Sequence, residues 1–466
     1  MSRPIQEAYI VAATRTPVGK APRGMFRNVR PDDLLAHVLK AAMERCPGLD
    51  PGVVEDVIVG CAMPEGEQGF NVARMGLLLA GFPDRVAGMT INRFCSSGVQ
   101  AVALAADRIR LGEADVMIAG GTESMSMVPM GGNKPSYNPV IFEKDANVAI
   151  AYGMGITAEK VAAQWKISRE AQDLYAAESH RRAVHAIDSG EFRDEISAYP
   201  VVGRLPDLEA GEIRTVRHDA TTDEGPRRDT SPEALAKLRP AFALKGSVTA
   251  GNSSQMSDGA GAVVLMSESA VKRYNATPLG RFVSYAVAGV PPEIMGIGPI
   301  KAIPKALAQA GLRQEDMDWI ELNEAFAAQV LAVLGELKLD HEKVNPLGGA
   351  IALGHPLGAT GAIRVATLMH GLKRRKKKYG MVTMCIGTGM GAAGIFDARP
   401  QRGAGVMAAI PGDRGIGGSR VVRAQPRARW IAGRHRDAGP NSPDRTASRP
   451  LSPGRHRPDA GRSLAG

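Results

Sequence analysis

The chain has 466 residues, 44% of them hydrophobic and 23% charged, which is enough to bury a large core in two or more domain-sized units. Its formal net charge of +10 would suggest nucleic acid or an anionic membrane as a partner. However, residues 401–466 carry thirteen Arg, no Lys and four Asp, so nine of the ten charges lie in this tail. The rest of the chain is nearly neutral, and we expect it to bind neither a membrane nor a nucleic acid.

The cysteine content points to a reducing compartment. Four cysteines in a chain this long do not make a disulfide framework, and none forms the CxxC pair of a metal site. An apolar strand at residues 8–13 follows the start so closely that a signal peptide has no room, and no apolar run is long enough to span a membrane. We therefore expect a cytoplasmic protein without a metal.

The first half of the chain alternates strands and helices. Residues 53–61 and 114–121 are short, β-branched apolar runs that predict buried strands. Between them, residues 97–111 place apolar side chains on one side at helical spacing. This order predicts a parallel sheet with helical crossovers, hence an α/β fold.

A similar pattern returns near the C-terminus. Thr360 and Gly361 open an Ala-rich helix, and a strand at 380–385 follows it, as a strand follows the helix at 97–111. The shared order predicts two similar α/β halves, although any two β-α-β units would look alike at this level.

The segment between the halves is richer in Pro, Met and charge, with amphipathic helices predicted at 157–164 and 170–187. The tail is crowded with Pro, Gly, Arg and Ser and is predicted to be disordered. The predicted division is an N-terminal half at 1–123 and 248–275, an inserted loop domain at 124–247, a C-terminal half at 276–399 and the tail at 400–466.

Cys95 is the first candidate for chemistry. It lies in Asn92-Arg93-Phe94-Cys95-Ser96-Ser97-Gly98, at a predicted strand-to-helix turn. The unpaired N–H groups of a helix N-terminus favour a thiolate, so we expect a lowered pKa. A cysteine in such a place can also be a small buried hydrophobe.

Three further motifs contain candidate residues. His355, in a Gly-rich turn before a helix, could take a proton from a thiol, or it could be a solvated loop residue. Cys385 ends a strand and precedes Gly387, whose turn could form an oxyanion hole. Asn323 and Glu324 follow a probable strand at 319–322 and could simply cap a helix.

Together these motifs resemble the thiolase family. The resemblance rests on Asn-x-x-Cys-x-Ser-Gly at 92–98, Asn-Glu-Ala-Phe at 323–326, Gly-His-Pro-x-Gly-x-x-Gly at 354–361 and Cys-x-Gly-x-Gly-x-Gly at 385–391. It covers about residues 5–397 and implies a fold of two β-α-β-α-β-α-β-β halves with a loop domain that holds CoA. It also implies an acyltransferase that cleaves 3-ketoacyl-CoA with CoA by ping-pong chemistry, with CoA as co-substrate and no permanently bound cofactor.

The resemblance assigns a role to each catalytic candidate. Cys95 is the nucleophile that becomes acylated, His355 deprotonates it, and Cys385 moves the second proton. Asn323, through a water, and His355 stabilise an enolate, while the N–H groups of Cys95 and Gly387 stabilise the tetrahedral intermediate. By the same likeness, the residues that line the acyl or pantetheine site are Ser254, Met154, Ala250 and Ala325.

One departure bears on the substrate. Gly153 stands where biosynthetic acetoacetyl-CoA thiolases often carry His, which favours a degradative 3-ketoacyl-CoA thiolase of fatty-acid β-oxidation. The alternatives are a biosynthetic acetoacetyl-CoA thiolase, a condensing synthase of the same fold, and a non-catalytic CoA- or lipid-binding protein. Cys385 argues against the synthase.

Family likeness further predicts a homodimer or homotetramer. Arg227, Arg228, Arg239 and Lys245 are possible contacts for the CoA phosphates. The Arg-rich tail either binds an acidic partner or is an idle extension, and its lack of Lys favours the idle extension.

Overall fold

The computed structural model describes residues 5–399, with the side chain of Leu205 left out. The predictions for the tail at 400–466 lie outside the described residues. Within the described part, no helix combines the length and apolar character needed to cross a bilayer.

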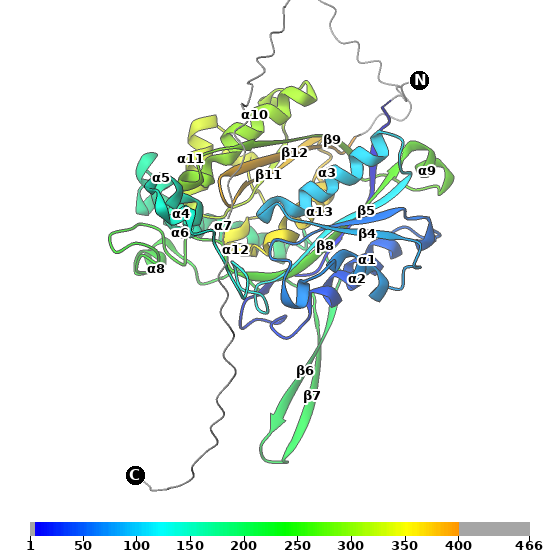
Figure 1. Ribbon diagram of the computed structural model, residues 1–466, viewed down its shortest axis with the longest axis horizontal. Coiled ribbons are helices and arrows are strands. Elements are labelled where there is room, and N and C mark those ends of the chain that lie inside the picture. Colours follow the sequence, from blue (N-terminus) through cyan, green and yellow to red (C-terminus); the bar gives the residue numbers. More distant parts are fainter. Residues whose placement is uncertain (1–4, 400–466) are drawn as a thin grey trace, which may run out of the picture. The chain divides into compact units, whose positions relative to one another are not determined.

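One large mixed sheet organises this part of the chain (Figure 1). Its order is β10-β11-β12-β9-β1-β8-β5-β3-β4, and β2 pairs with β8. The strands are β1 (Ala8–Arg15), β2 (Gly19–Lys20), β3 (Asp56–Gly60), β4 (Ala87–Ile91), β5 (Val116–Ser124), β8 (Ser257–Ser267), β9 (Gly280–Gly289), β10 (Trp319–Leu322), β11 (Tyr379–Ile386) and β12 (Met390–Asp397).

The sheet consists of two halves with the same strand order. In the first half, β4-β3-β5-β8-β1 has parallel pairing of β3 with β4 and β5, and antiparallel pairing of β8 with β5 and β1. In the second half, β10-β11-β12-β9 repeats this pattern, and an isolated parallel bridge from Ile320 to Val344 occupies the place of β4. The halves join where β1 pairs with β9. The predicted fold of two similar α/β halves is therefore confirmed.

Helices cover both faces of each half. The helices of the two halves are α1 (Pro31–Glu44), α2 (Val72–Leu79), α3 (Ser97–Arg110), α9 (Glu268–Arg273), α10 (Gly298–Ala310), α11 (Ala327–Leu337), α12 (Ala350–Leu353) and α13 (Leu357–Arg374). Short 3-10 helices are η1 (Pro51–Val53), η2 (Gly66–Gln68), η3 (Phe94–Ser96), η5 (Pro292–Ile297), η6 (Gln314–Asp316) and η7 (His341–Lys343). α1 packs on β8, α10 packs on β9 and β12, and α3 and α13 lie between the two halves (Figure 1).

α3 and α13 approach each other until their backbones touch. A Cβ added to Gly98 would lie 2.5 Å from the amide nitrogen of Ala362, and one added to Gly361 would lie 2.1 Å from that of Val99. Glycine is required at both positions because any side chain would collide with backbone. This contact brings the N-termini of the two helices together, and the turns that precede them carry Cys95 and His355.

The segment between β5 and β8 contains helices and one hairpin. Its helices are α4 (Val140–Glu143), α5 (Asp145–Val148), η4 (Ala149–Ala151), α6 (Met154–Gln164), α7 (Arg169–Asp188) and α8 (Pro232–Ala236). The sequence did not predict the hairpin of β6 (Tyr199–Asp207) and β7 (Glu212–Ala220), which extends away from the sheet in Figure 1. Its exposed charges and prolines hide the strand pattern, since few of its side chains are buried.

A buried ion-pair cluster fixes this segment to β1. Arg15, which is 2% exposed, binds Glu195 at 2.6 Å and Asp223 at 2.7 Å. The cluster lies at both ends of the hairpin region, so it holds the base of the hairpin against the central sheet. Because all three groups are buried, loss of one partner would leave an unpaired charge in the core.

The boundaries of some elements differ from those predicted. The strand expected at 53–61 begins only at Asp56, because residues 51–53 form η1, which starts with Pro51. The helix expected at 157–164 starts three residues earlier, at Met154. The helix that was expected to open at Thr360 starts earlier, at Leu357. His355 therefore lies two residues before its first residue.

Candidate active site

Cys95 lies in η3, between the edge strand β4 and the long helix α3. The residue is partly exposed, and the backbone N–H groups of Gly387 and Cys95 act to lower the pKa of its thiol. Even so, burial of the sulfur raises the pKa of Cys95 to about 12. The expectation of a lowered pKa was therefore wrong, because loss of water outweighs the two amides. The thiol is protonated at neutral pH and needs a base.

His355 is buried in the turn between α12 and α13. Its Nδ1 lies 2.6 Å from Thr360 Oγ1, and its Nε2 lies 3.3 Å from Asn323 Nδ2. Because the amide nitrogen Nδ2 of Asn323 can only donate, Nε2 of His355 is the accepting nitrogen, and Nδ1–H donates to Thr360. Burial, with a contribution from Arg364, lowers the pKa of His355 to about 3, so the ring is neutral and can accept a proton.

Asn323 does not cap a helix, since α11 begins only at Ala327 and its N-cap is Phe326. The Asn323 side chain is buried and binds His355 instead. Among the described residues its Oδ1 has no hydrogen-bond partner. A buried oxygen of this kind can accept a hydrogen bond from a bound water or a ligand.

Glu324 supports the His355 turn, a role that the sequence did not indicate. Its buried carboxylate accepts hydrogen bonds from Tyr175, Ser179, Asn345 and the amide of Ile351, at 2.7–3.1 Å. These partners come from α7, from the loop before α12 and from α12 itself. Glu324 thus fixes the segment that leads into His355, and the Asn-Glu pair of the motif serves two different purposes.

Cys385 lies near the end of β11 and is fully buried. Gly387, Thr388 and Gly389 form the tight turn to β12, with φ of 65° at Thr388 and 91° at Gly389. Burial raises the pKa of the Cys385 thiol well above its ordinary value, with a smaller contribution from Cys95. Cys385 and Cys95 lie in one site, because β11 contacts η3, which carries Cys95.

An apolar cluster surrounds Cys385 and contains two of the predicted lining residues. Met154 and Ala325 both pack in it, and a Cβ added to Gly387 would lie 3.6 Å from the sulfur of Met154. The amide of Ser254 donates to the carbonyl of Ala325 at 2.9 Å, so Ser254 borders the same region. Ala250 is exposed and lies outside this cluster.

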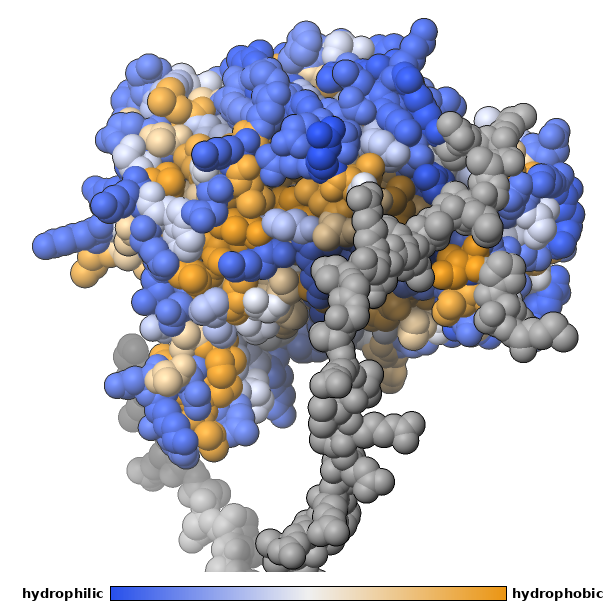
Figure 2. All heavy atoms as spheres, turned by 90° about the horizontal axis from the view of Figure 1, so that it is seen from above, coloured by the Kyte–Doolittle hydropathy of each residue, from blue (hydrophilic) through white to orange (hydrophobic). Residues whose placement is uncertain are grey.

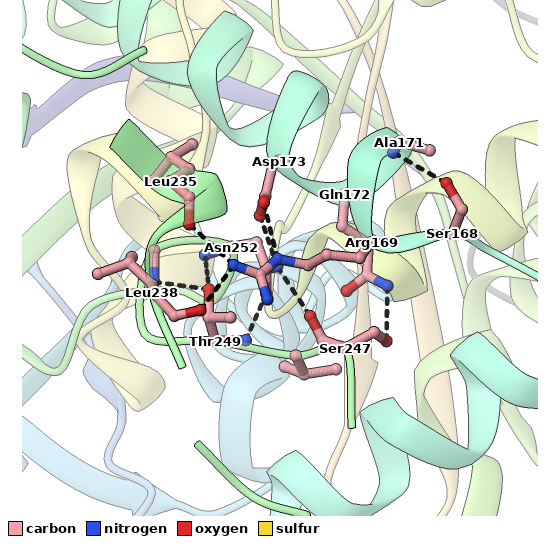
Figure 3. A network of polar contacts seen from close by, with 12 residues as sticks. Ser168, Arg169, Ala171, Gln172, Asp173, Leu235, Leu238, Ser247, Thr249 and Asn252 are labelled. Atoms are coloured by element: carbon pink, nitrogen blue, oxygen red, sulfur yellow. Dashed lines mark hydrogen bonds and ion pairs between the residues drawn. The ribbon is translucent and has the colours of Figure 1, made fainter. Parts of the chain in front are cut away.

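A polar network holds the loop that carries Ala250 and Ser254 (Figure 3). Asn252 donates to Asp173 at 2.9 Å and accepts from the amide of Thr249 at 2.8 Å. Arg169 binds the other oxygen of Asp173 at 2.7 Å, and it also donates to the carbonyls of Leu235 and Leu238. Hydrogen bonds to Asp173 therefore attach the loop to α7.

Comparison with known proteins agrees with this geometry. The chain matches the family models "Thiolase, N-terminal domain" at residues 8–269 and "Thiolase, C-terminal domain" at 276–398. The chain belongs to the thiolase family, which confirms the resemblance seen in its motifs.

Several named relatives are close. The chain is 50% identical to the 3-ketoacyl-CoA thiolase of Bacillus subtilis (strain 168) over 84% of this chain and all of that protein. It is 47% identical to the human peroxisomal 3-ketoacyl-CoA thiolase over 84% of this chain and 91% of that one. The crystal structure of the Bacillus anthracis acetyl-CoA acetyltransferase superposes with a TM-score of 0.76 at 42% identity, over 85% of this chain and all of that one.

Proposed function

We propose that this enzyme cleaves 3-ketoacyl-CoA with CoA through an acyl-Cys95 intermediate. In the first half-reaction, His355 Nε2 takes the proton of Cys95 as its sulfur attacks the C3 carbonyl. The C2–C3 bond then breaks, and Cys385 gives its proton to the carbanion of acetyl-CoA. The observation that carries the proposal is the packing of η3, which carries Cys95, against both α13, which follows His355, and β11, which carries Cys385.

The second half-reaction restores both thiols. The Cys385 thiolate takes the proton of CoA, whose sulfur attacks the acyl thioester on Cys95. As the tetrahedral intermediate collapses, Cys95 leaves as a thiolate and regains its proton from His355. Two separate half-reactions predict ping-pong kinetics.

Two groups of donors serve the charges that develop. The N–H groups of Cys95 and Gly387, which lower the pKa of the Cys95 thiol, suit the oxyanion of the tetrahedral intermediate. Asn323, through a water on its unpaired oxygen, and His355 suit the enolate.

The substrate class that we propose is the broader one of degradative thiolases. Support comes from Gly153, which is exposed and has open space at its Cβ position, and from relatives that are named 3-ketoacyl-CoA thiolase. The structural neighbour named acetyl-CoA acetyltransferase keeps the short-chain alternative in the test.

We further propose that the loop domain at 124–247 holds CoA, with Ser254, Met154, Ala250 and Ala325 along the pantetheine or acyl group. Of the four possible phosphate contacts, Arg228 is already paired with Asp188 at 2.5 Å. Arg239 and Lys245 are exposed and offer the free charges. CoA is a co-substrate here, and we propose no permanently bound cofactor.

Exposed apolar groups support assembly into a homodimer or homotetramer. β4 is a free edge of the sheet, and its Met89 is 39% exposed. Beside it, α2 and the residue before its cap expose Phe70, Met75, Leu78 and Leu79. An apolar patch next to a free edge is typical of an interface. Figure 2 shows apolar side chains gathered in a hollowed band on another view of the surface.

A cytoplasmic location stays a prediction.

The test uses the purified full chain with CoA and 3-ketoacyl-CoAs of short and medium chain length, followed by the loss of enolate absorbance. Turnover that disappears in Cys95→Ala supports the proposal, and the chain-length profile separates the degradative from the biosynthetic activity. A protein that binds acyl-CoA but turns over no chain length would instead be a non-catalytic binding protein.

A further inference from the structure

The turn that presents Cys95 has an unusual backbone. Phe94, the residue before the nucleophile, has φ of 44°, a left-handed conformation that a bulky residue rarely adopts. Two side chains hold this turn. Asn92 Oδ1 accepts from the amide of Phe94 at 2.8 Å, and Ser97 Oγ accepts from the amide of Arg93 and donates to the carbonyl of Phe94.

Asn92 also reaches outside its own turn. Its Nδ2 donates to the carbonyl of Ala62 at 3.0 Å, in the loop that follows β3. The two ends of one amide thus connect the backbone just before Cys95 to a separate segment of the first half.

That separate segment is anchored by a buried carboxylate. Glu123, at the end of β5, is 0% exposed and accepts from the amides of Ala62 at 2.7 Å and Met63 at 3.2 Å. The side chain of Gln68 also donates to it. The same carboxylate accepts from the amide of Gly358 at 2.8 Å, in the first turn of α13. Gly358 is three residues after His355.

A continuous path therefore joins the two catalytic turns, from Gly358 through Glu123, the Ala62 peptide and Asn92 to Phe94. Gly358 fits this path closely, since an added Cβ would lie 2.7 Å from the amide nitrogen of Ala62. The path crosses from the second half of the molecule to the first. The helices α3 and α13 also touch directly at Gly98 and Gly361. That contact is packing of backbone on backbone and orients no side chain.

We propose that Asn92 and Glu123 are positioning residues that fix the Cys95 turn relative to the His355 turn. Asn92 holds Phe94, whose ring lies beside Gly387, and with it the backbone that carries the Cys95 sulfur. Glu123 holds the Ala62 peptide and the start of α13 in one place. Neither residue touches the reacting atoms, so their effect passes through the geometry of Cys95. The proposal rests on the proposed function, in which Cys95 is acylated.

The first experiment separates positioning from general stability. Asn92→Ala removes both hydrogen bonds, whereas Asn92→Asp keeps the acceptor for Phe94 and loses the donor for Ala62. Asp50→Ala is the matched control, because Asp50 is exposed, lies outside the loop domain and likewise accepts from the amide two residues later, at 2.8 Å. The readouts are the single-turnover rate of Cys95 acylation, the pH profile of Cys95 alkylation by iodoacetamide followed by mass spectrometry, and Tm.

We expect Asn92→Ala to slow acylation about 10- to 100-fold, since small displacements of a nucleophile have effects of this size. Its alkylation profile should move to higher pH, because a misplaced turn weakens the amide contacts to sulfur. Asn92→Asp should lie between, and Asp50→Ala should match the wild type. An Asn92→Ala enzyme with the wild-type rate constant and alkylation profile would overturn the proposal, even if it were less stable.

The second experiment tests whether the two residues act together. In Glu123→Gln an amide NH₂ faces backbone donors, so the path is broken at its centre. If the path is one device, Asn92→Ala combined with Glu123→Gln should slow acylation by much less than the product of the single effects. Independent, multiplicative effects would contradict it, and if Glu123→Gln does not fold, Gln68→Ala perturbs the same carboxylate more gently. Alkylation of Cys95 needs no turnover, so these results stand apart from a failure of the thiolysis assay.

Discussion

The turns before α3 and α13 occupy equivalent places in the two halves, yet they present their functional groups differently. Cys95 is partly exposed, while His355 is 4% exposed and held between Thr360 and Asn323. The strained residue before Cys95 is Phe94, whereas the positive φ before His355 falls on Gly354, at 93°. The repeat thus provides two helix starts, and the local side chains decide that one carries the partly exposed thiol that we propose as the nucleophile and the other the shielded imidazole that we propose as its base.

The largest effect is expected when the proposed nucleophile, Cys95, is replaced. Cys95→Ala should lower the rate of thiolysis by at least ~10⁴-fold, because an alanine side chain cannot form the acyl thioester. Steady-state rates with a medium-chain 3-ketoacyl-CoA measure the loss. Cys46→Ala, a buried cysteine in another cluster, is the control and should keep its activity. Equal losses in both variants would contradict the assignment of Cys95.

A second test disturbs the close contact between α3 and α13. Gly361→Ala places a Cβ 2.1 Å from backbone of α3 and should reduce the free energy of unfolding by about 1–3 kcal/mol or prevent folding, as overpacking does. Gly335→Ala in α11 is the matched control, since its Cβ would meet open space, and it should be neutral or raise stability by up to about 1 kcal/mol. Urea denaturation of both variants measures the difference. Equal stabilities would show that the helices can move apart without cost.

The His355 turn can be tested through its hydrogen-bond partner. Thr360→Val keeps the shape and removes the acceptor for Nδ1–H, so the ring loses its preferred tautomer and kcat should fall about 10- to 100-fold. Thr360→Ser retains the hydroxyl and should recover most of the rate. If Thr360→Val were as active as Thr360→Ser, the contact would not orient the histidine.

Much of this arrangement could be predicted from the sequence, because the signals are local. Glycines beside Cys95, His355 and Cys385 mark turns at helix and strand ends, and the repeated order of elements predicts the two halves. The pKa of Cys95 could not be predicted, since it depends on water excluded by segments far away in the chain. The role of Glu324 was missed for the same reason, because its partners lie up to 149 residues away.

The smallest expected effect is a change in the pH dependence of stability, caused by buried histidines. Burial lowers the pKa of His355 to about 3 and that of His180 to about 4, below the ordinary value of 6.5. Between these values the unfolded chain binds more protons than the folded one, so stability is present above about pH 6.5 and is lost as the pH falls toward 3. Each such group adds a slope of at most ~1.4 kcal/mol per pH unit.

His355→Gln should make the stability curve flatter in this window, and His218→Gln, at an exposed position of the β6–β7 hairpin, should leave it unchanged. Urea denaturation at several pH values measures both slopes. A variant at His355 with the wild-type slope would mean that the imidazole is protonated in the folded enzyme near pH 6. In that case the imidazole would not be shielded from water as its burial between the two halves predicts.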